Sequence, residues 1–349
     1  MKRVTVIGAG SWGTALAMVL ADNHHDVRIW GRRAKQIEEI NTKHSNNQYL
    51  PGISLPEQIR AYEKMEEALE GTEVVVLVVP TKAIRTTIQQ MVEKLQSKVT
   101  IIHASKGIEP GSHKRISEMI EEEMYNSSFL EHVVVLSGPS HAEEVSRRQP
   151  TTVTVSSHSE QASKYTQDLF FNQHFRVYTN PDLIGVEIGG ALKNIIALVC
   201  GLTEGLKLGD NSKAAIMTRG LTEIARIGMK LGANPMTFAG LSGLGDLIVT
   251  CTSVHSRNFR AGLMLGRGKT LEDVLNEMGM VVEGVRTTQA AYELAKKLQV
   301  DMPITTALYR VLFEHVRPQD AADELMGRVK KHEVEDLPVD LIKSTFKED

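Results

Sequence analysis

A short β-branched run at residues 3–7 passes directly into the glycine-rich turn GAGSWG, from Gly8 to Gly13, and then into an alanine-rich helical stretch. A GxGxxG pattern is common by chance, but a strand before it and a helix after it give each glycine a task. Gly8 would form the tight turn, Gly10 would let the backbone approach a pyrophosphate, and Gly13 would let helix and strand pack closely. Because a helix N-terminus attracts phosphate, we predict a dinucleotide site here. The alternative is a glycine turn that serves packing alone.

The rest of the first half alternates strand-like runs with amphipathic helical stretches, an order typical of βαβ units. From residue 182 onward helical periodicity takes over and no β-rich run recurs. We therefore predict a Rossmann-type α/β domain with a mostly parallel sheet over residues 1–183, followed by an all-helical domain over residues 184–349. We expect the polar final segment KSTFKED to be frayed. The strand candidates are residues 3–7, 27–30, 74–79, 99–103, 133–136, 152–155 and 176–178; the helix candidates are residues 14–21, 34–43, 83–95, 161–171, 214–231, 271–277, 284–298 and 303–314.

The composition argues against several kinds of function. Forty basic and forty-three acidic residues give a formal charge of −3, without a basic run that would suit nucleic acid. The glycines at positions 8 and 10 end the N-terminal apolar run too early for a signal peptide, and the other apolar runs are strand-sized, so we expect no membrane span. Cys200 and Cys251 lack CxxC spacing and the twelve histidines show no HExxH motif. We therefore predict a cytoplasmic protein that binds no metal.

The end of the second predicted strand, RIWGRR, bears on cofactor choice. A site that prefers NADH usually has a carboxylate here, which binds the ribose 2′-hydroxyl. This chain has Arg32 and Arg33 instead, and guanidinium groups suit a 2′-phosphate. We therefore predict NADPH as the preferred cofactor and NADH as the second option. The alternative is a pair of solvated arginines that open the next helix.

Polar residues follow later strands at their carboxyl ends, where open α/β sheets bind ligands. Lys106 in ASKG could meet an anionic or carbonyl substrate, while Gly138 and Ser140 in SGPS offer backbone and hydroxyl donors. In the helical half, Asp246 lies in a glycine-rich turn, and Ser256-Arg257-Asn258 then opens a helix. With Ser256 as the expected N-cap, this helix start suits a phosphate. Each motif alone also fits an ordinary turn or a plain capped helix.

Lys193 is an unusual residue in the predicted helix GGALKNIIALVCG. It lies beside the apolar stripe of Leu192, Ile195, Ile196 and Val199, and its own neighbours on the helix are small. No carboxylate on the same side of the helix could pair with its ammonium group. The segment alone is compatible with a lysine that extends to solvent at the edge of a packed helix, or with one that has a function in the space around it.

The motifs in this order resemble those of the bacterial NAD(P)-dependent glycerol-3-phosphate dehydrogenases. The resemblance covers nearly the whole chain and runs through GAGSWGTALA, WGRR, VVPTKAI, ASKGIE, LSGPSHAEEV, EIGGALKNIIALVCG, GLSGLGDLIVTCTS, SRNFRAG and VEGVRT. It implies a Rossmann domain and a helical domain that closes the active site. It also implies the interconversion of dihydroxyacetone phosphate and sn-glycerol 3-phosphate, normally in the reducing direction, which supplies phospholipid synthesis.

The same resemblance maps the family's catalytic lysine to Lys193, as the group that donates or accepts the proton. An ammonium group there would stabilise and protonate the substrate oxygen as hydride reaches the ketone carbon. In the oxidative direction the amine must be neutral, and burial together with the second ammonium of Lys106 would lower its pKa. Asp246 would oppose that shift, so we assign it to orientation and hydroxyl binding.

The resemblance also implies the remaining binding residues. Lys106, Gly138, Ser140, Ser256, Arg257 and Asn258 are expected to contact substrate together with Lys193 and Asp246. The expected cofactor contacts are Gly8, Gly10, Ser11, Trp12, Gly13, Arg32, Arg33, Lys106, Ala142, Arg257, Val281 and Glu283, with Tyr49 as a looser candidate.

Two other functions compete with this interpretation. A β-hydroxyacid dehydrogenase would share the two-domain pattern, but the phosphate-suited Ser256-Arg257-Asn258 cluster argues against a carboxylate substrate. A non-catalytic dinucleotide sensor could dispense with Lys193 and Asp246. We therefore expect an enzyme that acts on a small molecule, with a homodimer as one option for its assembly.

Overall fold

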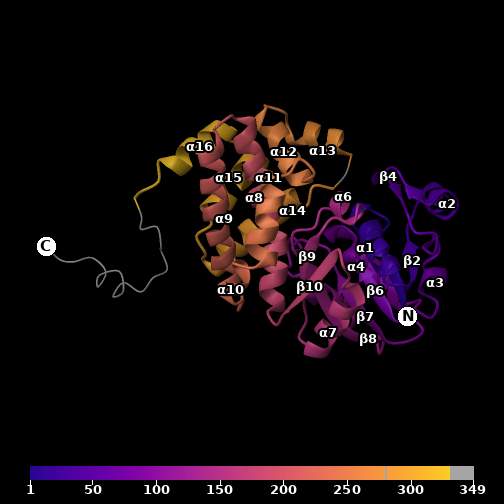
Figure 1. The fold of residues 1–349 in the computed structure, drawn as a ribbon. Coiled ribbons are helices and arrows are strands. Elements are labelled where there is room, and N and C mark those ends of the chain that lie inside the picture. Colours follow the sequence, from indigo (N-terminus) through magenta and orange to yellow (C-terminus); the bar gives the residue numbers. More distant parts are fainter. Residues whose placement is uncertain (280, 331–349) are drawn as a thin grey trace.

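The computed structural model describes residues 1–279 and 281–330 of the chain (Figure 1). It consists of an α/β half that contains the N-terminus and a helical half beside it. The KSTFKED segment and the last part of the predicted helical domain lie outside the described residues. The predicted fold class, a mostly parallel Rossmann-type sheet followed by helices, is confirmed.

The α/β half is built on one eight-stranded sheet with the order β10-β9-β8-β7-β6-β1-β2-β5. Its segment β5-β2-β1-β6-β7-β8 has the strand order of a doubly wound dinucleotide-binding fold. Strands β1, β2 and β5 are added toward one edge of the sheet and β6, β7 and β8 toward the other, so the order switches between β1 and β6. All pairs are parallel except β8 with β9, so β9 and β10 extend the sheet in the opposite sense. The strands are β1 (Arg3–Ile7), β2 (Asp26–Trp30), β5 (Arg60–Tyr62), β6 (Val74–Leu77), β7 (Val99–His103), β8 (Leu130–Ser137), β9 (Thr151–Ser156) and β10 (Phe175–Asn180).

Helices cover both faces of the sheet and create two hydrophobic cores. One core packs α1 and α7 against the sheet, and the other packs α3, α4 and α5 against the opposite face. Strand β6 is fully buried along its length, which is why its sequence, VVVL, does not alternate with polar residues. The helices of this half are α1 (Ser11–Asp22), α2 (Ala34–Lys43), α3 (Met65–Leu69), the 3-10 turn η1 (Thr81–Ala83), α4 (Ile84–Val92), α5 (Ile116–Met124), α6 (Ala142–Val145) and α7 (Glu160–Phe170).

All seven predicted strands are present, but the sequence analysis missed three short ones between α2 and β6. Two of them, β3 (Ser45–Asn46) and β4 (Leu50–Ser54), form a small antiparallel ribbon, and the third is the edge strand β5. Pro51 and Gly52 lie inside β4, and both residue types are depleted in strands. β5 has only three residues, too few for an alternating pattern to be recognised.

The helical half surrounds α8 (Leu183–Gly205), a long helix that is almost entirely buried. The predicted helices at 214–231, 271–277, 284–298 and 303–314 correspond to α9, α13, α14 and α15. The sequence analysis did not anticipate the π-helical turn η2, which lies just before Asp246. The elements after α8 are α9 (Asp210–Lys230), α10 (Pro235–Phe238), η2 (Leu241–Gly245), α11 (Asp246–Thr252), α12 (Arg257–Gly266), α13 (Leu271–Met278), α14 (Glu283–Leu298), α15 (Pro303–Phe313) and α16 (Pro318–Met326).

Helices α8 and α12 pack backbone against backbone. A Cβ atom added at Gly201 would lie 2.0 Å from the Phe259 carbonyl oxygen, and one at Gly262 would lie 1.9 Å from that of Leu198. Such distances are far below van der Waals contact, so only glycine permits this approach. The contact brings the start of α12 close to the middle of α8.

Helix α8 is also an exception to the expectation that apolar runs are strand-sized. By length and composition it is the one single helix in the described ranges that could cross a membrane, and the bent pair Pro235–Thr252 with Arg257–Gly266 would pass the same test if joined. However, 94% of the most apolar window of α8 is buried inside the fold, as expected for a core helix.

Candidate active site

Lys193 of α8 is buried and meets a carboxylate from another helix. Only 6% of the residue is exposed. Its Nζ atom donates hydrogen bonds to Asp246 Oδ1 at the start of α11 and, at 2.7 Å, to Thr250 Oγ1 one turn later. Asp246 lies fifty-three positions after Lys193, which explains why the sequence of α8 alone shows no ionic partner. Of the two alternatives for this lysine, extension to solvent is therefore excluded, because a buried, paired ammonium group does not extend to solvent.

Lys106 brings a second ammonium group to the same carboxylate. It follows β7, and its Nζ atom lies 2.6 Å from Asp246 Oδ2 and 3.4 Å from the Gly138 carbonyl oxygen. Ser140 Oγ donates to the same carbonyl oxygen at 2.9 Å. The ends of β7 and β8 therefore meet α8 and α11, and five of the predicted substrate residues lie in one cluster. We call Lys193, Asp246 and Lys106 the lysine–aspartate triad.

The environment of the triad shifts the pKa values of two of its members. Burial and the Lys106 ammonium group lower the pKa of Lys193 to about 7, although the Asp246 carboxylate raises it in part. Burial alone would raise the pKa of Asp246, but the two ammonium groups outweigh it and hold the pKa below its ordinary value. Near neutral pH Lys193 can therefore both donate and accept a proton, while Asp246 stays ionised.

The sequence analysis missed Thr250 and Asn194. Thr250 Oγ1 donates to the Asp246 carbonyl oxygen at 2.6 Å and so holds the hydroxyl group beside Lys193. Asn194 Oδ1 accepts a bond of 2.9 Å from Asn258 Nδ2. Asn194 directly follows Lys193, and Thr250 is one helical turn after Asp246. The i+4 spacing from Asp246 was therefore the available signal for Thr250, whereas Asn194 had none, because adjacent residues on a helix do not face each other.

The start of α12 lies beside this cluster. Ser256 is its N-cap, as predicted, and its Oγ atom accepts from the Phe259 amide at 3.2 Å. Arg257 is exposed and its Nη1 atom lies 3.4 Å from the Val281 carbonyl oxygen. Asn258 is buried, and its side chain bonds Asn194 and, through Oδ1, the Gly284 amide at 2.9 Å. Asn258 therefore joins α8, α12 and α14 and keeps one amide proton for any other partner.

The glycine-rich turn between β1 and α1 has the shape that a pyrophosphate requires. A Cβ atom at Gly13 would lie 1.9 Å from the Gly8 carbonyl oxygen, and Gly8 itself has a φ of +123°. At Gly10 an added Cβ would meet nothing within 4 Å. Gly10 is also the N-cap of α1, and no side chain caps the first amides of the helix. This arrangement fits the phosphates of a dinucleotide.

Several predicted cofactor residues form a rim next to this turn. Ser11 Oγ donates to the Tyr49 carbonyl oxygen at 2.9 Å, and the Arg33 guanidinium lies over the Tyr49 ring, 5.7 Å from its centroid. Arg33 Nη1 also donates to Gln48 Oε1 at 2.9 Å. Arg32 is exposed beside Arg33. The missed β3–β4 ribbon carries Tyr49 to this position in the loop between its strands, so the rim depends on an element absent from the sequence-based description.

The remaining predicted cofactor residues lie on three further elements. Trp12 is partly buried on the first turn of α1, and Ala142 is buried at the start of α6. Glu283 begins α14, and its Oε1 atom accepts a bond of 3.1 Å from the Thr81 amide, which follows β6. Glu283 Oε2 is buried and has no hydrogen-bond partner among the described residues. The bond between Glu283 and Thr81 is therefore a second contact between the helical half and the strand ends of the α/β half. It leaves the Oε2 atom of Glu283 available.

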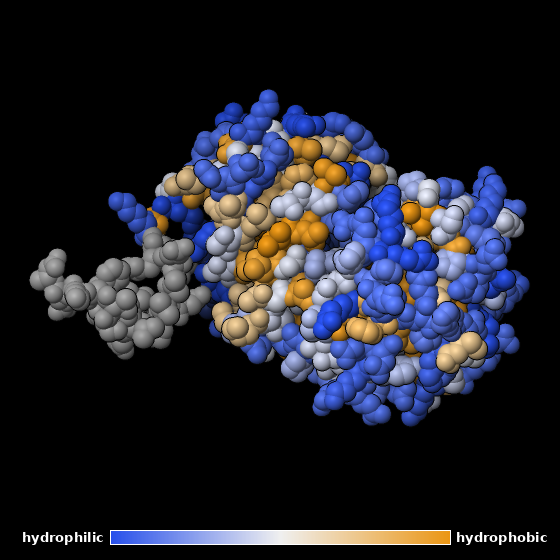
Figure 2. All heavy atoms as spheres, viewed as in Figure 1, coloured by the Kyte–Doolittle hydropathy of each residue, from blue (hydrophilic) through white to orange (hydrophobic). Residues whose placement is uncertain are grey.

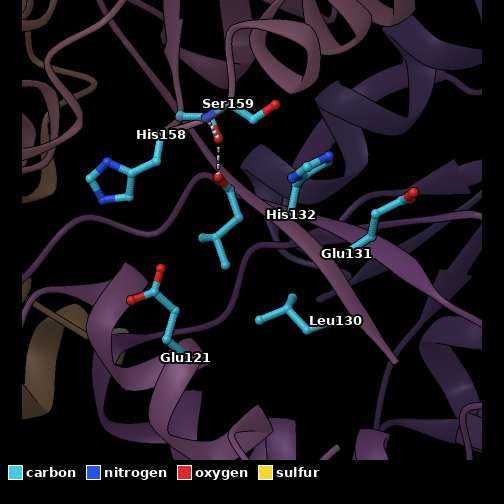
Figure 3. A pocket seen from close by; sticks show the side chains of 8 residues that line it. Glu121, Leu130, Glu131, His132, His158 and Ser159 are labelled. Atoms are coloured by element: carbon cyan, nitrogen blue, oxygen red, sulfur yellow. Dashed lines mark hydrogen bonds between the residues drawn. The ribbon is translucent and has the colours of Figure 1, made fainter. Parts of the chain in front are cut away.

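A separate pocket of about 320 Å³ lies at the other end of β8 (Figure 3). Its lining includes Glu121 of α5, His132 of β8, and His158 and Ser159 before α7. Since it adjoins the amino-terminal end of β8, it is remote from Ser140 and the triad. Within residues 1–279 and 281–330, no three His, Cys, Asp or Glu side chains are grouped to hold a metal ion.

Comparisons with known proteins agree with this arrangement. Family models described as the N-terminus and the C-terminus of NAD-dependent glycerol-3-phosphate dehydrogenase match residues 3–163 and 182–323. Proteins named glycerol-3-phosphate dehydrogenase (NAD(P)+) from Shouchella clausii and Bacillus cytotoxicus are 68% and 67% identical over 337 and 338 residues. Each alignment covers 97% of this chain and 99% of the relative. The crystal structure of glycerol-3-phosphate dehydrogenase from Coxiella burnetii is 40% identical, has a TM-score of 0.89, and covers 94% of this chain and 99% of its own.

Proposed function

This chain belongs to the NAD-dependent glycerol-3-phosphate dehydrogenase family, and on that basis we infer that the lysine–aspartate triad is its reaction centre. The enzyme catalyses the NAD(P)-dependent reduction of dihydroxyacetone phosphate to sn-glycerol 3-phosphate, a reversible reaction. This activity excludes the sensor and the β-hydroxyacid dehydrogenase considered from the sequence. The remaining question is which groups of the chain carry the reaction.

We propose that Lys193 is the proton donor in reduction and the proton acceptor in oxidation. When bound, the nicotinamide cofactor supplies hydride to the ketone carbon or accepts it in the reverse direction. The ketone oxygen then gains negative charge, which the ammonium group of Lys193 stabilises before it donates its proton. The amine regains a proton from solvent. Asp246 keeps the two ammonium groups in place, and Lys106 adds positive charge on the side of the α/β half.

The observation that carries this proposal is the burial of Lys193 with a pKa of about 7, in direct contact with Asp246. An amine with an ordinary pKa would remain protonated near neutral pH and could not accept the proton of the alcohol. The buried Asp246 carboxylate, in turn, prevents the amine from losing its proton at a much lower pH. Such a balance suits a group that works in both directions.

The test is to follow NADPH absorbance with purified protein and dihydroxyacetone phosphate, and to compare wild type with Lys193→Ala. We expect the variant to lose activity by a factor on the order of 10² to 10⁴, the usual contribution of a positioned acid or base. NADPH binding, measured by its fluorescence, should be unchanged. Lys213→Ala, on the exposed start of α9, is the matched control and should retain full activity. A Lys193→Ala variant that keeps wild-type turnover would contradict the assignment.

We propose the remaining binding roles by the same reasoning. Ser256 and Arg257 at the start of α12, with the second amide proton of Asn258, suit the phosphate of the substrate. Gly138 and Ser140 form the opposite wall. The glycine turn at Gly8, Gly10 and Gly13 suits the pyrophosphate, and the cofactor rim comprises Ser11, Trp12, Arg32, Arg33, Tyr49, Ala142, Val281 and Glu283.

We further propose that NADPH is preferred over NADH. Strand β2 ends in Trp30, and Arg32 and Arg33 follow it with no carboxylate among residues 31–37. The N-terminus of α2 follows at once and has no side-chain cap, so its amides add to the positive potential. A 2′-phosphate would find three sources of positive charge here, whereas a ribose hydroxyl would find no acceptor carboxylate.

We also propose a cytoplasmic homodimer that supplies glycerol 3-phosphate for phospholipid synthesis. Figure 2 shows apolar side chains gathered over the helical half, while the α/β half is mainly hydrophilic on this face. Exposed apolar residues of the helical half include Leu208, Met229, Met236, Leu244 and Ile248. Exposed apolar area of this kind often marks a protein interface. Light scattering during size-exclusion chromatography should give twice the chain mass, and a monomer mass would contradict the dimer.

A further inference from the structure

The structure contains a second buried charged cluster, centred on Glu187, that the reaction does not use directly. Glu187 lies on α8, six residues before Lys193, and only 7% of it is exposed. Its Oε2 atom accepts bonds from Arg115 Nη1 at 2.5 Å and Ser117 Oγ at 2.6 Å. Its Oε1 atom accepts from the Ser117 amide at 2.8 Å and lies 3.1 Å from His103 Nε2. We call Glu187 and these partners the Glu187 cluster.

The Glu187 cluster grips the loop that carries Lys106 at both ends. His103 is the last residue of β7, three positions before Lys106. Arg115 is the N-cap of α5 and pairs with Ile108 in a β-bridge, which closes the loop on itself. Since one carboxylate of α8 contacts both flanks, the position of the loop is set by α8. Lys193 belongs to the same helix.

The stem of Lys106 also rests on α8. A Cβ atom added at Gly190 would lie 3.7 Å from Lys106 Cγ and 3.8 Å from its Cδ. Gly190 lies halfway between Glu187 and Lys193, three residues from each. Lys106 is therefore held against α8 at its loop by Glu187 and along its side chain by Gly190, and its ammonium group reaches Asp246 at the far end.

We propose that Glu187 is a positioning residue that fixes the Lys106 loop to α8 and thereby sets the separation between the Lys106 and Lys193 ammonium groups. The proposal rests on the function proposed above for the lysine–aspartate triad. Glu187 itself touches neither the triad nor the substrate-binding residues, so it acts through the backbone that carries the two lysines. Of the two carboxylates on α8, Glu187 contacts both flanks of the Lys106 loop, whereas Glu204 pairs with Lys213 of α9.

Charge explains why Glu187 can serve as a permanent anchor. Burial would raise the pKa of Glu187, but His103, Arg115 and Ser117 together lower it to about 2. The carboxylate is therefore ionised at every pH at which the enzyme would be assayed. Glu121 of α5 carries like charge and also interacts electrostatically with Glu187.

Loosening this anchor has a defined effect on the reaction centre. The groups around Lys193 are Asp246, which raises its pKa, and Lys106, which lowers it, with His141 and Cys251 as further titratable neighbours. If the Lys106 loop moves away or water enters beside α8, the pKa of Lys193 must rise, because burial and Lys106 are the two causes that depress it. A purely structural role for Glu187 would leave that pKa unchanged.

The experiment compares Glu187→Gln with Glu223→Gln in the full-length enzyme. Glu223 is a control for the loss of a buried carboxylate, since it is buried on α9 and accepts from two amides and a hydroxyl at the start of α15. Burial raises the pKa of Glu223 to about 7, so its own profile is measured beside that of Glu187→Gln. We would measure the pH profile of kcat/KM for glycerol 3-phosphate oxidation, kcat for reduction, and NADPH affinity. For Glu187→Gln we expect kcat to fall on the order of tenfold, the apparent pKa near 7 to rise by about half a unit, and NADPH affinity to stay constant.

The outcomes separate this inference from the proposed function. A Glu187→Gln profile that matches wild type and Glu223→Gln would overturn the positioning role, even if the variant melts earlier. If Glu187→Gln does not fold, Ser117→Ala removes the hydroxyl that donates to Glu187 and accepts from Arg115 but keeps the Glu187 carboxylate, and it should shift the profile in the same direction. No shift would also overturn the positioning role. If Lys193→Ala retains activity, the proposed role of Lys193 fails instead, whatever Glu187 does.

Discussion

At the scale of single residues, the main feature of this enzyme is an amine whose pKa is set by opposing charges. Lys193 and Asp246 would form an ordinary ion pair if they were alone, and the amine would stay protonated. Burial and the ammonium group of Lys106 counteract that pairing and bring the pKa of Lys193 to about 7. The rate of glycerol 3-phosphate oxidation should therefore rise with pH through about 7, because the neutral amine is the active form.

Removing Asp246 and removing Lys106 should shift this pH dependence in opposite directions. Asp246→Asn removes the group that raises the pKa of Lys193, so the limb near pH 7 should shift to lower pH. Lys106→Met removes a group that lowers the pKa, so the same limb should shift to higher pH. Both variants should be slower than wild type. Measured kcat/KM profiles for oxidation test the pair, and shifts in the same direction would refute the charge balance described here.

The choice of cofactor is also decided by single residues. Replacing Arg33 with Asp puts like charge opposite a 2′-phosphate and removes one charged hydrogen bond, which contributes about 1.5–3 kcal/mol. We expect kcat/KM with NADPH to fall roughly ten- to a hundredfold, and kcat/KM with NADH to stay constant or rise. Arg60→Asp, an equally exposed change at the far end of neighbouring strand β5, is the control. Equal losses with both cofactors would show that Arg33 does not recognise the 2′-phosphate.

At the scale of secondary-structure elements, two glycines of the turn between β1 and α1 have different expected roles, one in packing and the other in cofactor binding. Gly13→Ala would bring a Cβ atom to 1.9 Å from the backbone of Gly8, whereas Gly10→Ala would meet nothing within 4 Å. We therefore expect Gly13→Ala to lower the melting temperature by several degrees. Gly10→Ala should melt like wild type but bind NADPH at least tenfold more weakly, since its methyl group occupies space for the pyrophosphate. Equal NADPH affinity in Gly10→Ala and wild type would show that the pyrophosphate does not bind at this turn.

The elements also show how much the sequence could predict. Buried strands were recognised as continuous β-branched runs, as in β7, and amphipathic helices by a periodicity that extends over many residues, as in α14. The β3–β4 ribbon and the π-helical turn η2 were missed because each is short and rich in residues that break patterns. Both matter for the site, since the ribbon presents Tyr49 and η2 leads into Asp246.

The same limit applies to the residues of the site. Periodicity placed Lys193 beside the apolar stripe of α8, but its partners Asp246 and Thr250 lie more than fifty positions away. The Glu187 cluster was missed for a similar reason, because it joins residues about seventy positions apart. The family resemblance supplied the expected roles, but the contacts that lower the pKa of Lys193 and hold its neighbours are properties of the folded chain.

At the scale of the whole molecule, the two halves are joined by buried charges. Asp246 of the helical half pairs with Lys106, Glu187 of α8 with Arg115, and Glu283 of α14 accepts from the Thr81 amide. Removing one member of a buried pair leaves the other without compensation, at a cost of about 3–5 kcal/mol. If one half unfolded alone, all these groups would lose their partners together. The two halves should therefore unfold in one step although each has its own core.

This argument predicts that scanning calorimetry will show a single transition, and that NADPH will move all of it to higher temperature. At a free concentration of a hundred times Kd, the ligand should add about 2.7 kcal/mol of stability. The glycine turn that suits NADPH belongs to the α/β half, so a shared shift requires coupling to the helical half. Two separate peaks, with only one moved by NADPH, would show that the halves unfold independently. In the double variant Asp246→Asn with Glu187→Gln, we expect two separate transitions to begin to appear, because the buried ion pairs of Asp246 with Lys106 and of Glu187 with Arg115 are both lost.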